Sequence, residues 1–237
     1  DNDLIYEEAI ENAITVVKNG LSLLPIKKLE NKKIAYVKFG DADGSPFLDE
    51  MNKYAKVDQI SGKDLATLKN KLSSYNLIIV GLHKSNESPW KAYKFTENEI
   101  FWLNEISLMG SSNLILTVFA TPYALLDVNT IDNIDGVVVS YQNSKLAQER
   151  TAQILFGAIP AKGVLPVTVN PIFPVNTGIQ LEGLMRLGYS FPERVGLSSS
   201  KLAEVDSLVQ SGIDSMMFPG AQVLIARRGE VIYNKGF

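Results

Sequence analysis

The feature that most constrains this chain is a repeated alternation between short, continuous apolar runs and longer segments with helical spacing. Runs rich in Val, Ile and Leu occupy residues 34–39, 77–80, 114–119 and 137–139. Such short runs are typical of strands that are buried on both faces. Segments with helical spacing follow at residues 64–72, 97–109 and 145–156. Because parallel neighbours are joined by crossover helices, we predict an α/β fold, a three-layer α/β/α sandwich around a mostly parallel sheet.

Helix-end signals sharpen this prediction. Thr96 and Glu99 form the pattern of a capping box, and Gly157 stands where the helix over residues 145–156 should end. Near the start of the chain, apolar residues recur at helical spacing from Ala9 to Val17, and Gly20 follows as a C-terminal cap. The first element is therefore predicted to be a helix over residues 9–17.

The last third of the chain has a different pattern. Prolines and glycines replace clear periodicity after Asn170, which predicts a linker or a loop along the sheet edge over residues 171–199. Order resumes with helical spacing over residues 202–216 and two strand-like runs around the turn 227–230. We expect a C-terminal helix and β-hairpin, which are too small to sustain their own core. This tail is therefore expected to dock on the first domain or to belong to something longer.

Composition narrows the class of function. A net charge of -3 without a basic stripe argues against a nucleic-acid partner, and the longest apolar runs are far too short to cross a bilayer. The absence of cysteine excludes disulfides, thiolate catalysis and cysteine-ligated zinc. No phosphate-binding or dinucleotide-binding glycine motif occurs, so we expect no cofactor and no metal. The polar, acidic first residues contain no signal peptide, although a domain excised from a secreted parent would look the same.

Two segments resemble the C-terminal α/β domain of family 3 glycoside hydrolases. The first is Ala13-Ile-Thr-Val-Val-Lys-Asn-Gly20 followed by Leu23-Leu-Pro-Ile26. The second is Tyr141-Gln142, then Ile154-Leu-Phe-Gly157 and Gly163-Val-Leu-Pro-Val-Thr168. Together they bracket about 155 residues, counted from the sequence, in the order and separation that this family uses. One departure is Asn143-Ser144-Lys145, where a turn rich in Gly and Glu is often found in the family.

The tail has a resemblance of its own. Its helix, the Phe218-Pro-Gly220 turn and the hairpin look like the start of serine hydrolases related to class C β-lactamases. The resemblances divide the chain into a glycosidase domain over residues 1–170, a linker over 171–199 and a truncated β-lactamase-like start over 200–237. A fusion of this kind resembles bacterial β-N-acetylglucosaminidases, with β-glucosidase as the alternative. It implies a partner barrel domain of the same parent chain, a carbohydrate substrate, and a periplasmic or cell-surface location.

The resemblance also implies where catalytic groups are expected. Retaining glycosidases use two opposed carboxyl groups, and in this family the nucleophile belongs to the barrel, as does the acid/base of the acetylglucosaminidases. No catalytic residue is therefore expected in this fragment, which is predicted to be inactive alone. In the β-glucosidase branch the acid/base comes from the C-terminal domain, and Glu87 is then the candidate. A solvated loop carboxylate is the competing interpretation of Glu87.

Candidate substrate-binding residues cluster after the second predicted strand. His83, the sole histidine, comes at the sheet edge where open α/β folds bind ligands, although a partly exposed polar residue at a strand end is the simpler interpretation. Trp90 and Tyr93, with Phe95, place three aromatic rings in one loop. Such rings stack on sugars or merely anchor a loop. The sequence thus allows two kinds of function, an enzyme part or a free-standing glycan-binding or scaffold module.

Other motifs are interpreted structurally. Asp41-Ala-Asp43-Gly44 lacks the later ligands of a calcium loop and is expected to be a turn. Ser198-Ser-Ser-Lys201 and Ser88-Pro-Trp-Lys91 match the Ser-x-x-Lys pattern of β-lactamases. Ser198 comes just before the predicted helix, so it is expected to cap that helix instead of acting as a nucleophile.

Overall fold

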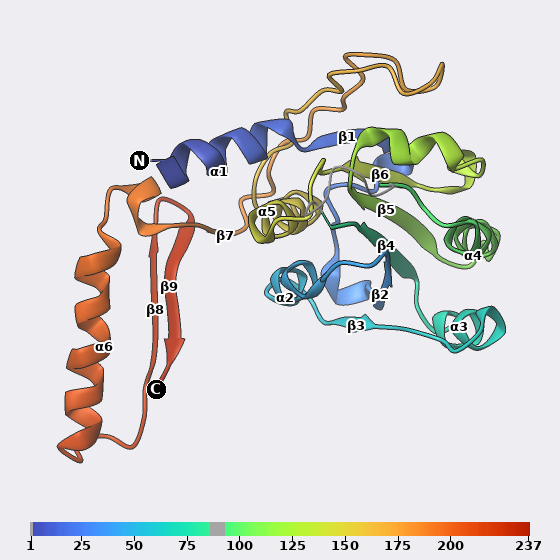
Figure 1. Ribbon diagram of the computed structural model, residues 1–237. Helices are drawn as coiled ribbons and strands as arrows, with labels where there is room; N and C mark the ends of the chain where they lie inside the picture. Colours follow the sequence, from blue (N-terminus) through green and yellow to red (C-terminus); the bar gives the residue numbers. More distant parts are fainter. Residues whose placement is uncertain (1, 86–92) are drawn as a thin grey trace. The chain divides into compact units, whose positions relative to one another are not determined.

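The computed structural model describes residues 2–85 and 93–237 (Figure 1). The chain forms two compact units. The larger unit comprises Glu8–Leu184, and the smaller one combines the residues up to Glu7 with Met185–Phe237.

The larger unit is built on one six-stranded sheet. Its strands are β1 (Thr15–Asn19), β2 (Ile34–Phe39), β3 (Val57–Gln59), β4 (Leu77–His83), β5 (Asn113–Phe119) and β6 (Gly136–Val139), in the order β1-β6-β5-β4-β2-β3. Every neighbouring pair is parallel except β1 and β6, which are antiparallel. The predicted mostly parallel sheet is confirmed.

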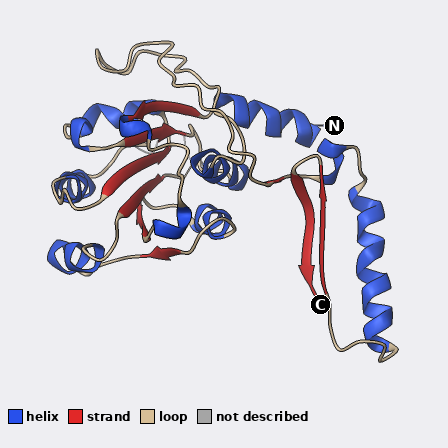
Figure 2. Cartoon of the chain, turned by 180° about the vertical axis from the view of Figure 1, so that it is seen from behind, coloured by secondary structure: helices blue, strands red, loops and turns tan. Residues whose placement is uncertain are grey.

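Helices cover both faces of this sheet, as Figure 2 shows from behind. The helices α2 (Ser45–Asn52) and α5 (Lys145–Phe156) pack in one core with the C-terminal end of α1 (Asn2–Ala13). The helices α3 (Leu65–Leu72) and α4 (Glu97–Ser107) pack in a second core on the opposite face. Short 3-10 turns complete the unit at Gly20–Ser22, Leu29–Asn31, Pro122–Asp127 and Ile131–Asn133. Two cores separated by one sheet make the predicted three-layer sandwich.

The prediction for the first element was wrong beyond Ala13. Instead of a helix over residues 9–17, α1 ends at Ala13 and the chain turns into strand β1. Thr15, Val16 and Val17 are β-branched residues that fit a pleated strand, and all three are buried against the edge of the sheet. Pairing with β6 therefore overrides a pattern of apolar residues that also fits a helix.

Several local predictions are confirmed. The side chain of Thr96 accepts a hydrogen bond from the backbone N–H of Glu99, and the Glu99 carboxylate accepts one from the backbone N–H of Thr96. The two bonds complete the capping box of α4. Gly157 adopts φ = 72° at the end of α5, a left-handed conformation that glycine adopts without steric cost. Two short elements that follow the loop after β2, α2 and β3, were not predicted from the sequence.

The two segments that carried the glycosidase resemblance meet in space. The Asn19 side-chain amide donates to the carbonyl oxygen of Leu24 and accepts from the backbone N–H of Leu24, each at 2.8 Å. Ile26 then donates its N–H to the carbonyl oxygen of Leu155, also at 2.8 Å. The resembling residues thus join the first strand to the last helix of the unit, which is a structural role.

Residues 163–181, which we call the arm, extend from the body of the larger unit as a long loop whose two limbs run side by side (Figure 1). Ala161 and Leu181 form a bridge at its base, and Ile179 donates its N–H to the carbonyl oxygen of Val16 in the edge strand β1. Phe173, only 3% exposed, anchors the arm in the core. The compact unit therefore continues to Leu184, past the expected end at residue 170. The identities assigned to the three domains stay predictions.

The smaller unit contains the predicted helix and hairpin. It comprises β7 (Gly188–Tyr189), a 3-10 turn (Pro192–Val195), α6 (Ser199–Asp214), β8 (Gln222–Arg227) and β9 (Glu230–Gly236), with the strand order β7-β9-β8. Ser198 caps α6 through a hydrogen bond from the N–H of Lys201, as expected. The Asp206 carboxylate joins α6 to β9 by accepting from the Tyr233 hydroxyl and pairing with Lys235 at 2.9 Å.

Candidate functional site

The strands β2, β4 and β6 end at the carboxyl edge of the sheet. In open parallel sheets this edge is where ligands bind, because successive loops leave the strands there. His83 is the last residue of β4, and its side chain is completely buried. The expectation of a partly exposed histidine is therefore wrong, since the strand continues through His83 and carries its ring inside.

Both ring nitrogens of His83 are hydrogen-bonded. The Tyr36 hydroxyl lies 2.7 Å from Nε2, and the Asn143 side-chain oxygen lies 2.7 Å from Nδ1. Asn143 in turn donates from Nδ2 to the carbonyl oxygen of Asp43 at 2.9 Å, so its other side-chain atom is the acceptor. Hence Nδ1 of His83 carries the proton and Nε2 accepts from Tyr36. A chain of three hydrogen bonds thus connects β2, β4 and the loops after β2 and β6.

The surroundings of His83 keep this ring neutral. Phe119 stacks on the His83 ring with ring centroids 4.3 Å apart, and the centroid of the Phe47 ring lies 6.1 Å from that of His83. Burial lowers the pKa of His83 to about 4, a shift that the Asn143 hydrogen bond opposes. Burial, and then the charge of Asp43, raises the pKa of Tyr36 above its usual range. At neutral pH both groups are uncharged, and their hydrogen bonds connect β2 and β4 to the loops after β2 and β6.

Glycines make room for this cluster. A Cβ at Gly44 would lie 2.5 Å from the Tyr36 hydroxyl, and one at Gly81 would lie 2.6 Å from Nε2 of His83. Gly40 adopts φ = 88°, and a Cβ there would overlap the carbonyl oxygen of His83. That carbonyl accepts from the N–H of Ala42. The loop after β2 is therefore fitted closely around the end of β4.

The loop after β2 has two exposed aspartates, Asp41 and also Asp43, whose carboxylate is hydrogen-bonded within the loop. Its oxygens accept from the backbone N–H of Ser45 at 3.0 Å and from the Ser45 hydroxyl at 2.8 Å. These hydrogen bonds lower the pKa of Asp43. The segment is the expected turn, and the Asp43 carboxylate is hydrogen-bonded to Ser45 within it. Within residues 2–85 and 93–237, no group of three His, Asp or Glu side chains is arranged to hold a metal ion.

The same loop is fixed from its other side by α4. The Gly40 N–H donates to one carboxylate oxygen of Glu99 at 2.6 Å. Lys84, nearly buried, places its ammonium 3.8 Å from the other oxygen. The Lys38 ammonium donates to the carbonyl oxygen of Gly40 at 2.9 Å. The carboxyl edge is therefore a rigid platform at the ends of β2 and β4.

The remaining predicted site residues have varied outcomes. Tyr93 is half-buried and packs against the core, and Phe95 is buried. A role of Tyr93 in binding sugar stays a prediction. Glu87 and Trp90 lie outside the described residues. Sequence reasoning missed Tyr36 and Asn143, which are 47 and 60 positions from His83. The available signal for Tyr36 was a hydroxyl within a buried apolar strand, because such a group requires a partner.

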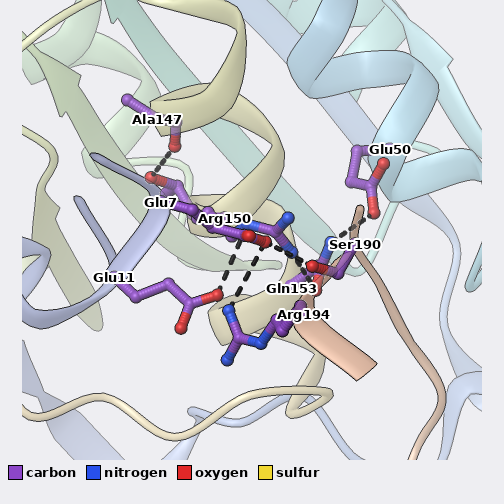
Figure 3. A network of polar contacts seen from close by, with 9 residues as sticks. Glu7, Glu11, Glu50, Ala147, Arg150, Gln153, Ser190 and Arg194 are labelled. Carbon is purple, nitrogen blue, oxygen red and sulfur yellow. Dashed lines mark hydrogen bonds and ion pairs between the residues drawn. The ribbon is translucent and has the colours of Figure 1, made fainter. Parts of the chain in front are cut away.

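A second polar network lies between helices of the larger unit (Figure 3). Arg150, 2% exposed, pairs with Glu11 at 3.5 Å and donates to the Gln153 side-chain oxygen at 3.0 Å. Gln153 then donates to the buried carboxylate of Glu50 at 2.9 Å, which also pairs with Lys53. Buried charges require such partners, so this network joins α1, α2 and α5. In the smaller unit, Glu7 accepts from Ser190 at 2.5 Å.

Comparison with known proteins gives a clear answer for the fold alone. Neither a family profile nor a curated protein sequence matches the chain. Similar solved structures include a fungal multi-domain β-N-acetylglucosaminidase of glycoside hydrolase family 3, with 17% identity and a TM-score of 0.57 over 76% of this chain and 20% of its own. The family 3 β-N-acetylglucosaminidase of Paenibacillus sp. FPU-7 has 14% identity and a TM-score of 0.54, over 70% of this chain and 32% of its own.

A β-glucosidase from Listeria innocua, solved with isofagomine, has 13% identity and a TM-score of 0.57, over 73% of this chain and 33% of its own. This chain shares the fold of a domain found in glycosidases. It spans a third or less of the length of these three proteins. No helix within the described ranges is both long and apolar enough to span a membrane.

Proposed function

We propose that this chain is the C-terminal α/β domain of a larger family 3 glycoside hydrolase that removes terminal β-linked N-acetylglucosamine. The observation that carries this proposal is the recurrence of its fold as one part of several glycosidases. In this proposal a barrel domain of the same parent supplies the catalytic nucleophile. The chain contributes the platform at the ends of β2 and β4, and the loops on it shape the aglycone side of the cleft.

The geometry of the carboxyl edge supports such a shaping role. The buried His83 is neutral and fully hydrogen-bonded, and the exposed Asp43 carboxylate is committed to Ser45. Retaining glycosidases need two carboxyl groups about 5–5.5 Å apart around the sugar. A platform of this kind positions loops without itself supplying that pair. The tail's resemblance to β-lactamase-like domains favours N-acetylglucosamine over glucose, and a periplasmic or cell-surface location belongs to the same proposal.

The test is hydrolysis of two chromogenic substrates by the full-length gene product. We expect turnover of 4-nitrophenyl N-acetyl-β-glucosaminide well above that of 4-nitrophenyl β-glucoside, and no turnover by the 237-residue chain alone. Turnover by that chain alone would contradict the proposal. Binding of chito-oligosaccharides without hydrolysis by the full-length protein would favour a glycan-binding module instead.

Glu87→Gln separates the two glycosidase types. If Glu87 were the acid/base of a β-glucosidase, its loss would lower kcat/KM by about 10²–10⁴-fold. In the acetylglucosaminidase that we propose, the barrel supplies this group and the variant keeps its activity. Asp49→Asn, at an exposed position on α2, is the matched control for removing one carboxylate.

A further inference from the structure

The arm is unusual in composition. Charged residues make up 21% of the chain, yet none occurs between Lys162 and Glu182. Three prolines occur within it, at residues 166, 171 and 174. A loop that only meets solvent has no reason to exclude charge, since exposed positions are where Lys, Glu and Asp are normally found.

Hydrogen bonds and core contacts hold the arm in one conformation. Leu165, fully buried, exchanges backbone hydrogen bonds with Thr177 and Asn176 at 2.8 Å each. Nearer the tip, the Thr168 hydroxyl accepts from the N–H of Val175 at 3.0 Å. Phe173 fixes the tip to the core. A surface ordered in this way loses little conformational entropy when it binds a partner.

Four exposed side chains of the arm are large and apolar, beside the exposed but uncharged Thr168, Asn176 and Gln180. Ile172 is 61% exposed, Val175 46%, Val164 44% and Ile179 37%. Val164 and Ile179 lie together at the base, because Gly178 packs directly against Val164. Ile172 and Val175 flank the buried Phe173 at the tip. Depletion of charge together with exposed apolar side chains is what distinguishes the centre of a protein–protein interface from ordinary surface.

We propose that the arm is a docking surface for an adjoining domain of the same polypeptide, a folded partner that presents an uncharged, apolar face. This inference rests on the proposed function. It commits to an adjoining domain because the aligned part of the chain covers only 20–33% of each of the three glycosidases that share its fold. Binding buries Ile172 and Val175 at the tip of the arm.

Thiol protection tests this proposal directly, because the chain contains no cysteine. Ile172→Cys places a single thiol at the tip of the arm, and Leu108→Cys places a matched one after α4, where Leu108 is 63% exposed. Both variants are made in the 237-residue chain and in the full-length gene product. The rate of maleimide labelling is measured at each site by peptide mass spectrometry, which distinguishes these thiols from any others in the longer protein.

We expect both thiols to react equally fast in the 237-residue chain. In the full-length protein the thiol at residue 172 should be labelled at about a tenth of that rate or below, because maleimide reaches it only when the contact opens. The thiol at residue 108 should keep its labelling rate. Equal labelling at both sites in the full-length protein would overturn the proposal. Protection in the shorter chain that grows with its concentration would overturn it in favour of self-association.

The two experiments distinguish failure of the docking surface from failure of the proposed function. Protection at residue 172 without hydrolysis of either chromogenic sugar would retain the docking surface and reject the glycosidase. Hydrolysis without protection at residue 172 would retain the glycosidase and reject the docking surface.

Discussion

Replacing Tyr36 with phenylalanine removes one hydroxyl group from the interior and leaves His83 with an unpaired ring nitrogen. With Nδ1 protonated toward Asn143, Nε2 loses its donor. In the other tautomer Nε2 carries the proton and faces an apolar ring, while Nδ1 loses its hydrogen bond to the Asn143 oxygen. Turning the Asn143 amide would break its hydrogen bond to the carbonyl oxygen of Asp43. Each rearrangement therefore leaves at least one buried polar group unsatisfied.

The size of the effect follows from this burial. Tyr36 and His83 are both completely buried, and Phe119 covers one face of the histidine ring. An unsatisfied buried acceptor costs about 1–3 kcal/mol. For a domain of this size, each kcal/mol lowers Tm by about 2–4 °C. We therefore expect Tyr36→Phe to lower the Tm of the larger unit by several degrees.

The sole histidine of the chain reports the unfolding of this unit. Urea unfolding is followed by the C2 proton of His83 in NMR spectra, with circular dichroism as a second probe. Tyr75→Phe is the matched control, because its hydroxyl donates to Asp58 at 3.0 Å at a half-exposed position where water can replace it. If both variants lose the same stability, the hydrogen bond to His83 has no special weight and the reasoning is refuted.

Three further predictions test the same geometry. His83 should titrate near pH 4, below the pKa of about 6.5 for an unfolded histidine. The free energy of unfolding should therefore rise by up to about 3 kcal/mol between pH 4 and 6.5 and stay level above pH 6.5. NMR titration and pH-dependent urea unfolding check this, and a titration midpoint near 6.5 would contradict it. Gly40→Ala should cost about 2–4 kcal/mol in urea unfolding, because φ = 88° is combined with overlap of the His83 carbonyl. Gly110→Ala, with φ = 64° and only the carbonyl oxygen of Leu108 at 4.0 Å from the added Cβ, should cost about 1–2 kcal/mol, and equal losses would argue against the close fit. Phe173→Ala should cost about 3–5 kcal/mol, whereas its exposed neighbour Ile172→Ala should be nearly neutral in the 237-residue chain; two equal small losses would show that Phe173 does not anchor the arm.

Local signals predicted much of this fold. The buried strands, the capping box at Thr96 and the C-cap at Gly157 depend on residues close together in sequence, and each is confirmed. The error at Thr15–Asn19 has the opposite origin. Its apolar pattern fits a helix and a strand equally, and its pairing with β6 decides between them.

The candidate site was less accessible to sequence reasoning. His83 could be singled out as the only histidine at a strand end. Its burial and its hydrogen-bond partners could not be predicted, because Tyr36 lies on another strand and Asn143 lies in a loop distant in sequence. The predicted roles of Glu87 and Trp90 in catalysis and binding stay predictions.

The antiparallel edge strand β1 has a consequence for how the larger unit forms. Thr15 pairs with Val139, so the first strand of this sheet along the chain meets its neighbour only after nearly all of the sheet has been synthesised. Contacts between such distant positions slow folding, because a long loop must close before they form. Nascent chains that stop before residue 136 should therefore carry β1 as an unpaired segment. The unit closes in a late step that brings its two ends together.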